Sequence, residues 1–522
     1  MKSPAREIAE ELLAKEAPTR RDLERAKFRV ARSRGLPGLP SNADVLRCLS
    51  PEERARLGPL LRRKRVRAAS GVTVVAVMTA PRPCPHGRCV FCPGGPGEGT
   101  PQSYTGHEPA ALRGFQSGYD GYAQVRSRVG QLEAIGHRVD KVDLIVMGGT
   151  FPSAPWEEQR GFVKECLDAV TLVPSSSLEE AKRLAESSRV RVVGITFETR
   201  PETLSPGGVD RLLELGATRV EIGVQNPSDE IYRLVKRGHT VEDVVRGTRV
   251  ARDSGLKICY HMMPGLPGSS LDEDYQAFSK VFEDPRFRPD MLKIYPTLVV
   301  KGTELYDWWK RGEYQPLSVE EAVDLLARVK SRLPPWVRVM RVQRDIPAHQ
   351  ITAGIKKGNL RQLVQEEMGR RGLECKCIRC REVGHRAMRG VEVDGESLGL
   401  NRIVYEASGG VEVFLSVEDR RGTLVGFTRL RVPGEPHRRE ITAHTGSIRE
   451  LHVYGEMTPV GEEPLDWQHQ GWGKRLMAEA ERVAREEFDL RKMVVMSALG
   501  TKEYYRGLGY QRDGVYVSKP LD

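Results

Sequence analysis

Short runs of β-branched residues alternate with amphipathic helical segments between residues 71 and 345. The strand-like runs are Val72–Met78, Val142–Met147, Val190–Phe197, Arg219–Gln225, Lys257–Met263, Met291–Tyr295 and Val337–Gln343. Helical periodicity fills the intervals, as in Pro155–Val170, Gly208–Leu215 and Val241–Ser254. This rhythm predicts an α/β fold with a parallel sheet curved into a full or partial barrel. Active sites of such barrels lie at the C-terminal ends of the strands.

The loop after the first strand-like run carries three cysteines within nine residues, Cys84, Cys89 and Cys92, in P-C-P-H-G-R-C-V-F-C-P-G-G-P. Three thiolates suit a 4Fe–4S cluster that keeps one iron open for S-adenosylmethionine (SAM). A zinc site that includes His86 is the alternative, and unligated thiols are a weaker one. Four residues separate the first two cysteines, instead of the three that are common in radical-SAM proteins, so the rest of the chain must decide.

Glycines and polar residues follow the later strand-like runs. Glycines let a backbone come close to a ligand, and a carboxylate, a guanidinium and an amide suit the ribose and amino-acid groups of SAM. A tight turn, a loop cap or a salt bridge explains each residue singly, whereas their common place at strand ends predicts a SAM site. The candidate residues are Gly148, Gly149, Thr150, Glu198, Arg200 and Gln225.

The composition indicates a soluble cytoplasmic protein. Hydrophobic residues make up 39% of the chain, and no apolar run approaches the ~20 residues of a membrane helix. Met1–Lys15 carries charges of both signs and lacks the apolar stretch of a signal peptide. Nine cysteines in 522 residues do not make a secreted disulfide framework, so we expect the thiols to stay reduced in the cytoplasm.

Basic residues concentrate in the helical region 1–70. It holds 18 lysines and arginines against nine aspartates and glutamates, while the whole chain has a net charge of only +11. Such a block can neutralise nucleic-acid phosphates, although a solvated helix face is the alternative. The residues expected to contact a phosphate backbone are Arg62, Arg63, Lys64, Arg65 and Arg67.

Residues 346–390 form a short connector with three closely spaced cysteines. These are Cys375, Cys377 and Cys380, in C-x-C-x-x-C spacing. The spacing predicts a structural zinc site whose fourth ligand is His349 or His385. A second iron–sulfur cluster and unligated thiols are the alternatives.

Residues 391–522 read as a separate α/β domain with two candidate coenzyme A elements. Small residues at a helix start leave backbone N–H groups free for a diphosphate, although an ordinary glycine-rich helix cap is the alternative. This loop, which fits the GNAT pattern Q/R-x-x-G-x-G/A, comprises Gln470, Gly471, Trp472, Gly473 and Lys474. A preceding strand would expose backbone groups to the pantetheine arm at Glu450, Leu451, His452 and Val453.

Several of these segments resemble the catalytic subunit of Elongator. The matching segments read C-V-F-C-P-G-G-P, Q-S-Y-T-G-H-E-P, D-K-V-D-L-I-V-M-G-G-T-F, K-I-Y-P-T-L and R-D-I-P, and the match runs from about residue 70 to the end. This family joins a radical-SAM domain to a GNAT-type acetyltransferase domain and modifies wobble uridines of tRNA. The short gap between Cys84 and Cys89 resembles the archaeal and bacterial single-subunit relatives, which act without the other Elongator subunits.

Together with the basic block and the connector cysteines, the resemblance predicts four regions: a basic helical tRNA-binding region 1–70, a radical-SAM partial (β/α) barrel 71–345, a zinc connector 346–390 and a GNAT domain 391–522. The resemblance implies a tRNA uridine(34) acetyltransferase that forms 5-carboxymethyluridine from acetyl-CoA, with a 4Fe–4S cluster, SAM and an external electron donor, while the structural zinc ion rests on the spacing of the connector cysteines. Tyr505 is expected at the thioester as a proton donor to the thiolate, and Lys141 at the same acetyl-CoA site. A core tyrosine and a strand-edge lysine are the alternatives.

Three other functions remain to be separated from this one. A protein lysine acetyltransferase would use only the C-terminal domain and leave the loop cysteines unexplained. A radical-SAM methylthio- or methyltransferase on RNA would not need the coenzyme A loop. A non-catalytic tRNA-binding scaffold would not need Tyr505 beside that loop.

Overall fold

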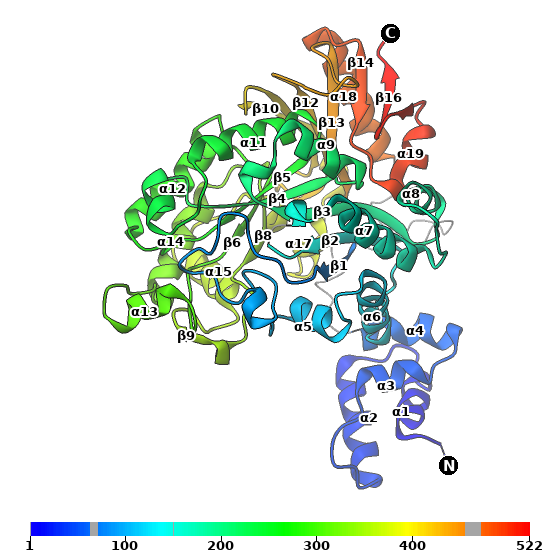
Figure 1. The fold of residues 1–522 in the computed structure, drawn as a ribbon. Helices are drawn as coiled ribbons and strands as arrows, with labels where there is room; N and C mark the ends of the chain where they lie inside the picture. Colours follow the sequence, from blue (N-terminus) through cyan, green and yellow to red (C-terminus); the bar gives the residue numbers. More distant parts are fainter. Residues whose placement is uncertain (1, 63–70, 150, 455–470) are drawn as a thin grey trace.

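A computed structural model describes residues 2–62, 71–149, 151–454 and 471–522. Three bodies follow one another along the chain: a small helical bundle, an open barrel and a mixed sheet (Figure 1). The bundle projects from the barrel beside α6 (Gly121–Ala134), and the C-terminal sheet covers a different side. Among the described residues, no helix has the length and apolar character needed to cross a membrane.

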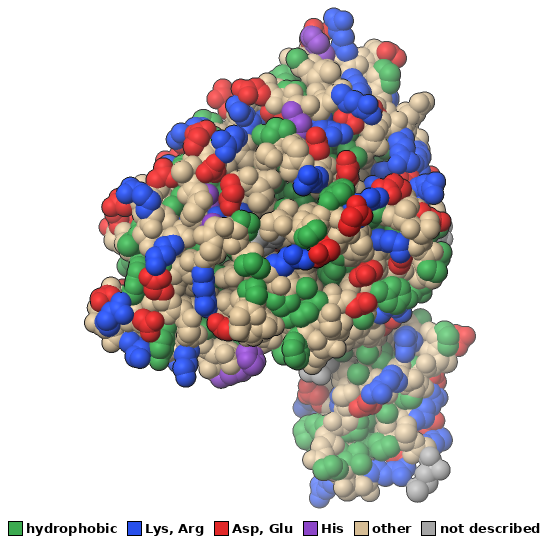
Figure 2. Space-filling view, in the orientation of Figure 1, with side chains coloured by type: hydrophobic (Ala, Val, Ile, Leu, Met, Phe, Trp, Pro, Cys, Tyr) green, Lys and Arg blue, Asp and Glu red, His purple; other side chains and the backbone are tan. Residues whose placement is uncertain are grey.

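Four helices build the N-terminal bundle, as the helical periodicity predicts: α1 (Pro4–Leu13), α2 (Arg20–Ser33), α3 (Asn42–Arg47) and α4 (Pro51–Leu61). Capping boxes at Thr19, Ser41 and Ser50 start the last three helices by satisfying their first backbone N–H groups. Apolar residues such as Ile8 and Leu57 fill a core of the bundle's own. Charged side chains of both signs cover the visible face of the bundle and barrel (Figure 2).

Seven parallel strands form the barrel in the order of the chain: β1 (Thr73–Met78), β2 (Lys141–Met147), β3 (Arg191–Thr199), β4 (Arg219–Gln225), β5 (Lys257–Met262), β6 (Met291–Ile294) and β8 (Arg338–Val342). Because β1 and β8 are the edges of this sheet, the barrel is partial. Helices α7 (Trp156–Thr171), α8 (Leu178–Ser187), α9 (Pro206–Glu214), α11 (Val241–Asp253), α12 (Leu271–Glu283) and α14 (Val319–Arg332) connect successive strands. The α/β fold class and the partial barrel are thereby confirmed.

Strand alternation decides what faces the lumen of the barrel. On β2, Val142 and Leu144 are fully buried in the main hydrophobic core, while Lys141, Asp143 and Ile145 line the central cavity. Successive side chains of a strand point to opposite faces, so every second residue is available to a ligand inside the barrel. The alternation of residues along each strand therefore determines which side chains line the cavity.

Elements that the sequence did not predict close one side of the cysteine loop. They include the two-stranded pair β7 (Val299–Val300) and β9 (Ile351–Ala353), and helix α13 (Glu304–Lys310). Leu305 N–H donates to the carbonyl of Val90 at 2.9 Å, which attaches α13 to the loop.

The connector follows as α15 (Leu360–Arg370), α16 (Ile378–Arg381) and α17 (Val383–Ala387), and Cys377 packs into the barrel core.

The C-terminal domain is a seven-stranded mixed sheet in the order β10-β11-β12-β13-β14-β16-β15. Its elements are β10 (Gly399–Ala407), β11 (Gly410–Glu418), β12 (Leu424–Val432), β13 (Thr445–Val453), α18 (Trp472–Phe488), β14 (Lys492–Val495), α19 (Lys502–Arg506), β15 (Gln511–Asp513) and β16 (Tyr516–Pro520). The parallel pairing of β13 with β14 ends at Ile448, whereas β13 stays paired with β12 as far as Val453. The two central strands therefore splay apart after Ile448.

Buried ion pairs attach this sheet to the N-terminal end of the barrel. Arg449 Nη2 lies 2.6 Å from Asp290 Oδ1, just before β6. Arg431 Nη2 lies 2.7 Å from Asp253 Oδ1, at the end of α11. All four side chains are fully buried, and removing one partner of such a pair leaves an uncompensated buried charge. The C-terminal sheet and the cysteine loop therefore lie at opposite ends of one barrel.

Candidate active site

One cavity of about 1190 Å³ runs through the barrel lumen. At the C-terminal end of the strands its wall includes Cys84, Cys89 and Cys92. At the other end its wall includes Tyr505 and residues 449–454 of the splayed strand β13. The two halves of the site that the sequence predicts therefore line one cavity.

Basic groups surround the buried thiol of Cys89. Arg237 Nη1 lies 3.4 Å and His86 Nε2 lies 3.2 Å from its sulfur. Burial, together with Arg200 and Arg237, lowers the pKa of His86 to about 4, so the imidazole stays neutral. The guanidinium of Arg237 is placed to donate a hydrogen bond to a metal-bound sulfur at this position.

Two residues of the Q-S-Y-T segment hold the third cysteine. Gln102 Nε2 donates to the sulfur of Cys92 at 3.3 Å, and Ser103 Oγ lies 3.0 Å from it. Tyr104, the next residue, donates its hydroxyl proton to Glu198 Oε2 at 2.6 Å. This segment thus joins the cysteine loop to the end of β3.

The spacing of the sulfur atoms distinguishes the two cysteine clusters. Four zinc ligands at ~2.3 Å would bring the sulfurs to about 3.8 Å from one another. Among the described residues, the sulfurs of Cys375, Cys377 and Cys380 meet this condition, since they all lie within 4.8 Å of one another, whereas the three loop cysteines form no such group. The connector cysteines therefore fit a single ion, whereas the loop cysteines do not converge as closely in the part of the chain that the structure describes.

Glycines are required where β2 meets the cysteine loop. Gly148 has φ +139°, and a Cβ there would lie 2.0 Å from Thr79 Oγ1. Gly149 has φ +73°, and a Cβ there would lie 3.0 Å from the carbonyl oxygen of Gln102. The backbone at this strand end is thus packed against the loop, as a ligand-binding turn requires. Thr150, a further predicted SAM residue, lies outside the described residues.

The remaining SAM candidates divide into two kinds. Glu198 and Gln225 both line the cavity, and Gln225 holds a left-handed backbone with φ +69°. The side-chain oxygen of Gln225 is buried without a hydrogen-bond partner among the described residues. Arg200 also lines the cavity, but its guanidinium points to His86 Nε2 at 3.2 Å and to the carbonyl of Arg237 at 2.5 Å. The contacts of Arg200 thus favour a role in holding the cysteine loop.

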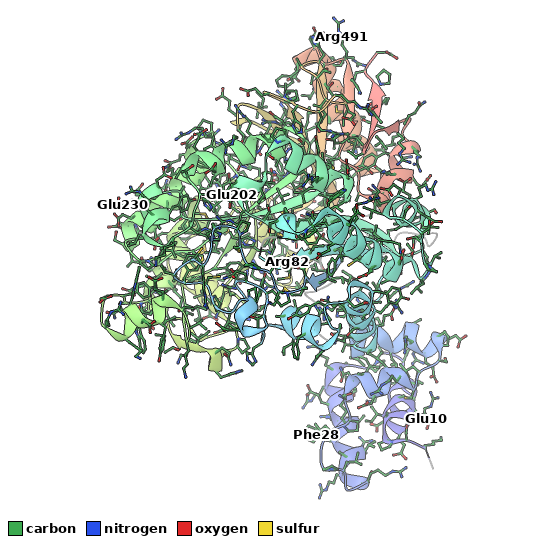
Figure 3. All side chains as sticks on the ribbon, in the orientation of Figure 1. Glu10, Phe28, Arg82, Glu202, Glu230 and Arg491 are labelled. Atoms are coloured by element: carbon green, nitrogen blue, oxygen red, sulfur yellow. The ribbon has the colours of Figure 1, made fainter. Side chains whose placement is uncertain are left out.

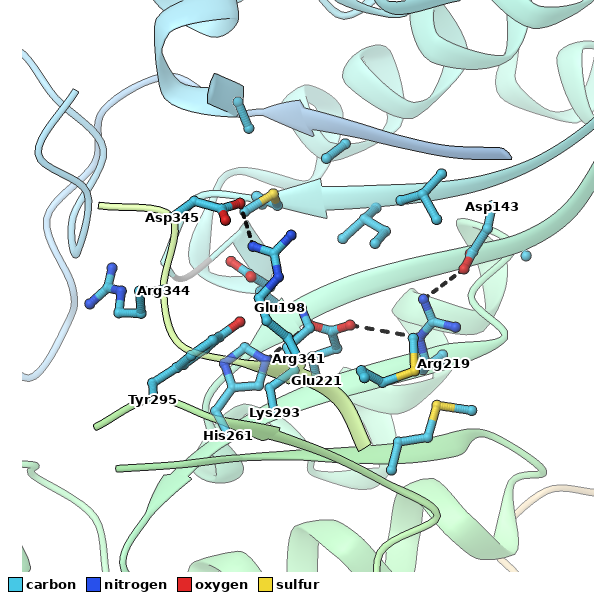
Figure 4. A pocket seen from close by; sticks show the side chains of 18 of the residues that line it. Asp143, Glu198, Arg219, Glu221, His261, Lys293, Tyr295, Arg341, Arg344 and Asp345 are labelled. Atoms are coloured by element: carbon cyan, nitrogen blue, oxygen red, sulfur yellow. Dashed lines mark hydrogen bonds and ion pairs between the residues drawn. The ribbon is translucent and has the colours of Figure 1, made fainter. Parts of the chain in front are cut away.

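A charged belt crosses the middle of the lumen (Figure 4). Arg219 Nη2 donates to Asp143 Oδ2 at 2.8 Å, and Glu221 accepts from Lys293 and from His261 Nε2, the latter at 2.9 Å. Burial acts to raise the pKa of Glu221, but Lys293 and His261 outweigh it and hold the pKa below its ordinary value. Glu221 is therefore ionised within the barrel.

Sequence reasoning missed this charged belt, although a signal was present. Charged residues recur at every second position of strands that are otherwise apolar, as Arg219 and Glu221 do on β4. A position repeated at period two lies on one face of a strand, and the opposite face packs against the helices. The sequence pattern by itself therefore indicates a polar lumen.

The coenzyme A candidates divide: the strand residues line the cavity at the N-terminal ends of the barrel strands, whereas the described loop residues Gly471–Lys474 are not part of its wall. Gly471, with φ +81°, precedes α18, and a Cβ on Gly473 would lie 2.6 Å from the hydroxyl of Tyr504. Trp472 points into the core of the domain, so only its backbone faces the helix start, while Lys474 is exposed. Gln470 lies outside the described residues.

The splayed strand and two titratable side chains complete this mouth. The predicted strand residues Glu450, Leu451, His452 and Val453 all line the cavity. Arg429 Nε donates to the Glu450 carboxylate at 2.9 Å. Tyr505 and Lys141 line the same cavity, and burial raises the pKa of Tyr505 and lowers the pKa of Lys141. Tyr505 therefore keeps its proton at neutral pH, as a proton donor must.

The two histidines considered as a fourth zinc ligand have other partners. His385 Nε2 lies 3.0 Å from Glu382 Oε1. The ring of His349 packs edge-on against that of His107, with 5.8 Å between the ring centres. Neither histidine belongs to the three-sulfur group among the described residues.

The basic region presents one helix face without ion pairs. On α2 the side chains of Arg21, Arg25 and Arg32 are exposed, and none has an ion-pair partner among the residues that the structure describes. Phe28 lies on the same face and is 63% exposed (Figure 3).

Of the predicted basic run, the structure describes Arg62, whose Nε donates to the carbonyl of Gly136 at 3.3 Å. Arg63, Lys64, Arg65 and Arg67 lie outside the described residues.

Comparison with protein-family models gives three matches. An ELP3 N-terminal domain model matches residues 1–69, a Radical SAM superfamily model matches residues 81–279, and a Radical_SAM C-terminal domain model matches residues 289–370. The Radical SAM match implies a 4Fe–4S cluster and SAM in this chain.

Similar proteins cover nearly the whole chain. A tRNA uridine(34) acetyltransferase of Methanocaldococcus jannaschii is 51% identical over 93% of this chain and 91% of its own length. Elongator complex protein 3 of Homo sapiens is 44% identical over 96% of this chain and 93% of its own. The solved structure of the archaeal Methanocaldococcus infernus Elp3 with an N-terminal deletion aligns at TM-score 0.77 and 47% identity, over 86% of this chain and 99% of that one. The resemblance is thereby confirmed, and the chain belongs to the family of tRNA uridine(34) acetyltransferases and Elongator complex protein 3.

Proposed function

We propose that this protein is a tRNA uridine(34) acetyltransferase that forms 5-carboxymethyluridine at the tRNA wobble position from acetyl-CoA. One observation carries the proposal: a single cavity has the three loop cysteines at one end and the splayed strand with Tyr505 at the other. A lysine acetyltransferase has no use for the first end, and an RNA methyltransferase has no use for the second. The comparisons support the same function, because the archaeal relatives carry this name.

At the cysteine end, Cys84, Cys89 and Cys92 would hold three irons of the cluster. Arg237 Nη1 contacts the sulfur of Cys89 and Gln102 Nε2 contacts that of Cys92, so both would donate hydrogen bonds to cysteine ligands of the cluster. When bound, the cluster and SAM supply a 5′-deoxyadenosyl radical that takes a hydrogen atom from the acetyl methyl group.

SAM itself would lie against the ends of β2, β3 and β4. The backbone at Gly148 and Gly149 would lie alongside it, because these residues follow the C-terminal end of β2 and Gly149 lines the cavity. Glu198 would accept from a ribose hydroxyl, and the unpartnered oxygen of Gln225 would accept from the amino group.

At the other end, the start of α18 would bind the diphosphate of coenzyme A through backbone N–H groups of Gly471–Lys474. The backbone of Glu450–Val453 would bind the pantetheine amides where β13 has left β14. Tyr505 would protonate the departing thiolate, and Lys141 would orient the thioester carbonyl.

The tRNA would contact the N-terminal bundle. Arg21, Arg25 and Arg32 lie exposed on one face of α2 and form no ion pair among the described residues, so they are available to phosphates. Phe28 on that face offers a ring on which a base can stack. The basic run Arg62, Arg63, Lys64, Arg65 and Arg67 would add positive charge for phosphate binding.

Cys375, Cys377 and Cys380 would hold a structural zinc ion that fixes the connector against the barrel. An external electron donor is needed, and no other Elongator subunit is.

Anaerobically reconstituted protein, SAM, reductant, acetyl-CoA and tRNA make the direct test. Mass spectrometry of the digested tRNA should show 5-carboxymethyluridine at the wobble position. Acetylated lysine with unchanged uridine would identify a protein acetyltransferase instead. A methylated or thiomethylated base would identify a methyl- or methylthiotransferase, and tRNA retention without turnover would identify a scaffold.

A further inference from the structure

A carboxylate of the barrel binds the helix that carries Tyr505. Glu186 lies near the end of α8, the helix that leads into barrel strand β3. Its Oε1 accepts from Lys502 Nζ at 3.0 Å, and its Oε2 accepts from Arg506 Nη2 at 2.7 Å. Both cations belong to α19, which lies beside α8 (Figure 1). One glutamate of the radical-SAM domain thus bridges two cations of the C-terminal domain.

The two cations flank Tyr505 on one face of α19. Lys502, Tyr505 and Arg506 occupy positions i, i+3 and i+4, which are neighbours on a helix surface. Lys502 and Tyr505 are buried. The hydroxyl of Tyr505 has no hydrogen-bond partner among the described residues. The position of this hydroxyl therefore follows from the placement of the helix.

The turn before α19 also packs on the barrel. The 3₁₀ turn η7 (Leu499–Thr501) leads into α19 and contacts β3. A Cβ on Gly500 would lie 2.7 Å from the backbone nitrogen of Val192, so the two backbones meet directly. Ala498 lines the cavity, as Tyr505 does. This end of the cavity is thus built where the two domains touch.

The carboxylate of Glu186 is ionised between its two partners. Burial acts to raise its pKa, but Arg506 and Lys502 outweigh burial and hold the pKa below its ordinary value. Hydrogen bonds between oppositely charged groups are roughly twice as strong as those between neutral groups. A neutral residue in place of Glu186 would leave Lys502 without an ion pair among the described residues. The charge of Glu186 therefore restrains α19.

We propose that Glu186 is a positioning residue for Tyr505, and that its bridge to Lys502 and Arg506 places the tyrosine hydroxyl for proton donation to the thiolate of coenzyme A. This inference rests on the proposed function. In the hydrolysis, water adds to the thioester carbonyl, the C–S bond breaks and the thiolate takes the proton of Tyr505. The proton released by the water restores the tyrosine. Glu186 is not part of the cavity wall, so it acts through α19.

The kinetic constants of one variant test this role. Glu186→Gln keeps the length of the side chain and removes its charge. In reconstituted full-length protein, kcat for tRNA-dependent acetyl-CoA hydrolysis should fall at least about tenfold, because small misplacements of a reacting group are costly. KM for acetyl-CoA should stay within about twofold, because no binding contact is lost. SAM cleavage without acetyl-CoA should persist.

A neighbouring glutamate is the matched control. Glu179 lies on the same helix, is exposed and pairs with Arg160 at 3.2 Å instead of with α19. Glu179→Gln should therefore behave as the parent protein. An unchanged kcat in Glu186→Gln, or an equal fall in Glu179→Gln, would overturn the proposal.

A double variant tests whether Glu186 acts through Tyr505. If it does, Glu186→Gln should lower kcat no further in a Tyr505→Phe background, because the two changes remove the same contribution. A general loss of structure would lower kcat by the same factor in both backgrounds, and that result would refute the positioning role. Slow hydrolysis by Tyr505→Phe with normal hydrolysis by Glu186→Gln defeats this inference alone. Normal hydrolysis by Tyr505→Phe removes the proton donor of the proposed function, and the inference falls with it.

The partner side chains keep the proposal testable if Glu186→Gln does not fold. Lys502→Gln and Arg506→Gln each remove one half of the bridge. Lys502 is buried and Arg506 is half-buried, so Lys502→Gln should lower kcat more, again with KM nearly constant. Glu503→Gln, which removes the other ion pair of Arg506, is the control on α19 and should leave kcat unchanged. Parent-like kcat in both bridge variants would overturn the proposal.

Discussion

Arg449 of β13 and Asp290 before β6 form a fully buried ion pair with 2.6 Å between Nη2 and Oδ1. A second oxygen of Asp290 accepts from Arg449 Nη1 at 2.8 Å, so the contact is bidentate. The pair joins the splayed strand β13 to the start of a barrel strand. It thereby aligns the C-terminal domain with the mouth of the lumen.

Breaking this pair should destabilise the whole protein. Asp290→Ala removes a buried carboxylate that pairs with both Arg449 and Arg429 and leaves Glu412 as the remaining acid on Arg449, and we expect a loss of about 3–5 kcal/mol in the free energy of unfolding, measured with urea. Glu313→Ala, which removes an exposed ion pair with Arg311, should cost at most about 1 kcal/mol. Equal losses in the two variants would show that the junction does not depend on this pair.

Replacing Tyr505 should slow the hydrolysis of the acetyl-CoA thioester and leave the cleavage of SAM unchanged. Tyr505→Phe removes the proposed proton donor and should slow tRNA-dependent acetyl-CoA hydrolysis by about 10²–10⁴-fold. SAM cleavage by the same variant should stay within about twofold. Tyr504→Phe alters the neighbouring tyrosine, which is 40% exposed, and serves as the control. Unchanged hydrolysis in Tyr505→Phe would indicate that this residue has only a packing role.

The face of α2 should supply salt-dependent tRNA affinity. Replacing Arg21, Arg25 and Arg32 with glutamine should weaken tRNA binding and reduce the salt slope by about one for each phosphate that is no longer neutralised. Phe28→Ala should weaken binding with little change in that slope, because stacking carries no charge. Arg47→Gln, whose parent side chain pairs with Asp44, should have little effect. An unchanged slope in the triple variant would exclude this face.

A buried histidine beside the cysteine loop should make stability pH-dependent. Burial lowers the pKa of His239 to about 4, so the folded protein holds it neutral. The buried neutral imidazole contributes fully to the free energy of unfolding above the unfolded-state pKa of about 6.5. This contribution, about 3 kcal/mol, is lost as the pH falls from 6.5 towards 4. His239→Asn should reduce the fall in unfolding free energy over this range, compared with exposed His444→Asn. Parallel curves for all three proteins would refute the assignment.

The connector thiols should hold a metal that stabilises the junction. Cys377→Ser and Cys380→Ser should each release zinc, measured by elemental analysis, and lower the melting temperature. The radical step should persist in the folded fraction, because these thiols are distinct from Cys84, Cys89 and Cys92. Loss of SAM cleavage with unchanged melting would contradict a structural role.

The sequence predicted the strands better than it predicted the contacts among the side chains that line the lumen. Strand order followed from the βα rhythm, because successive parallel strands are neighbours in a barrel. The charged belt of Glu221 and Lys293 was missed, since period-two patterning shows that residues share a face but not which strands bring their charges together. Arg200 shows the same limit: its place at a strand end predicts a ligand, and its partner His86 is more than a hundred positions away.

Both ends of one cavity are proposed to act on the same acetyl group. Deuterium in the methyl group of acetyl-CoA tests this in a single reaction with tRNA, SAM and reductant. The proposed route predicts one deuterium in 5′-deoxyadenosine and the remaining two in the carboxymethyl group of the wobble uridine. Deuterium-free 5′-deoxyadenosine beside a labelled uridine, or no label in the uridine, would contradict it.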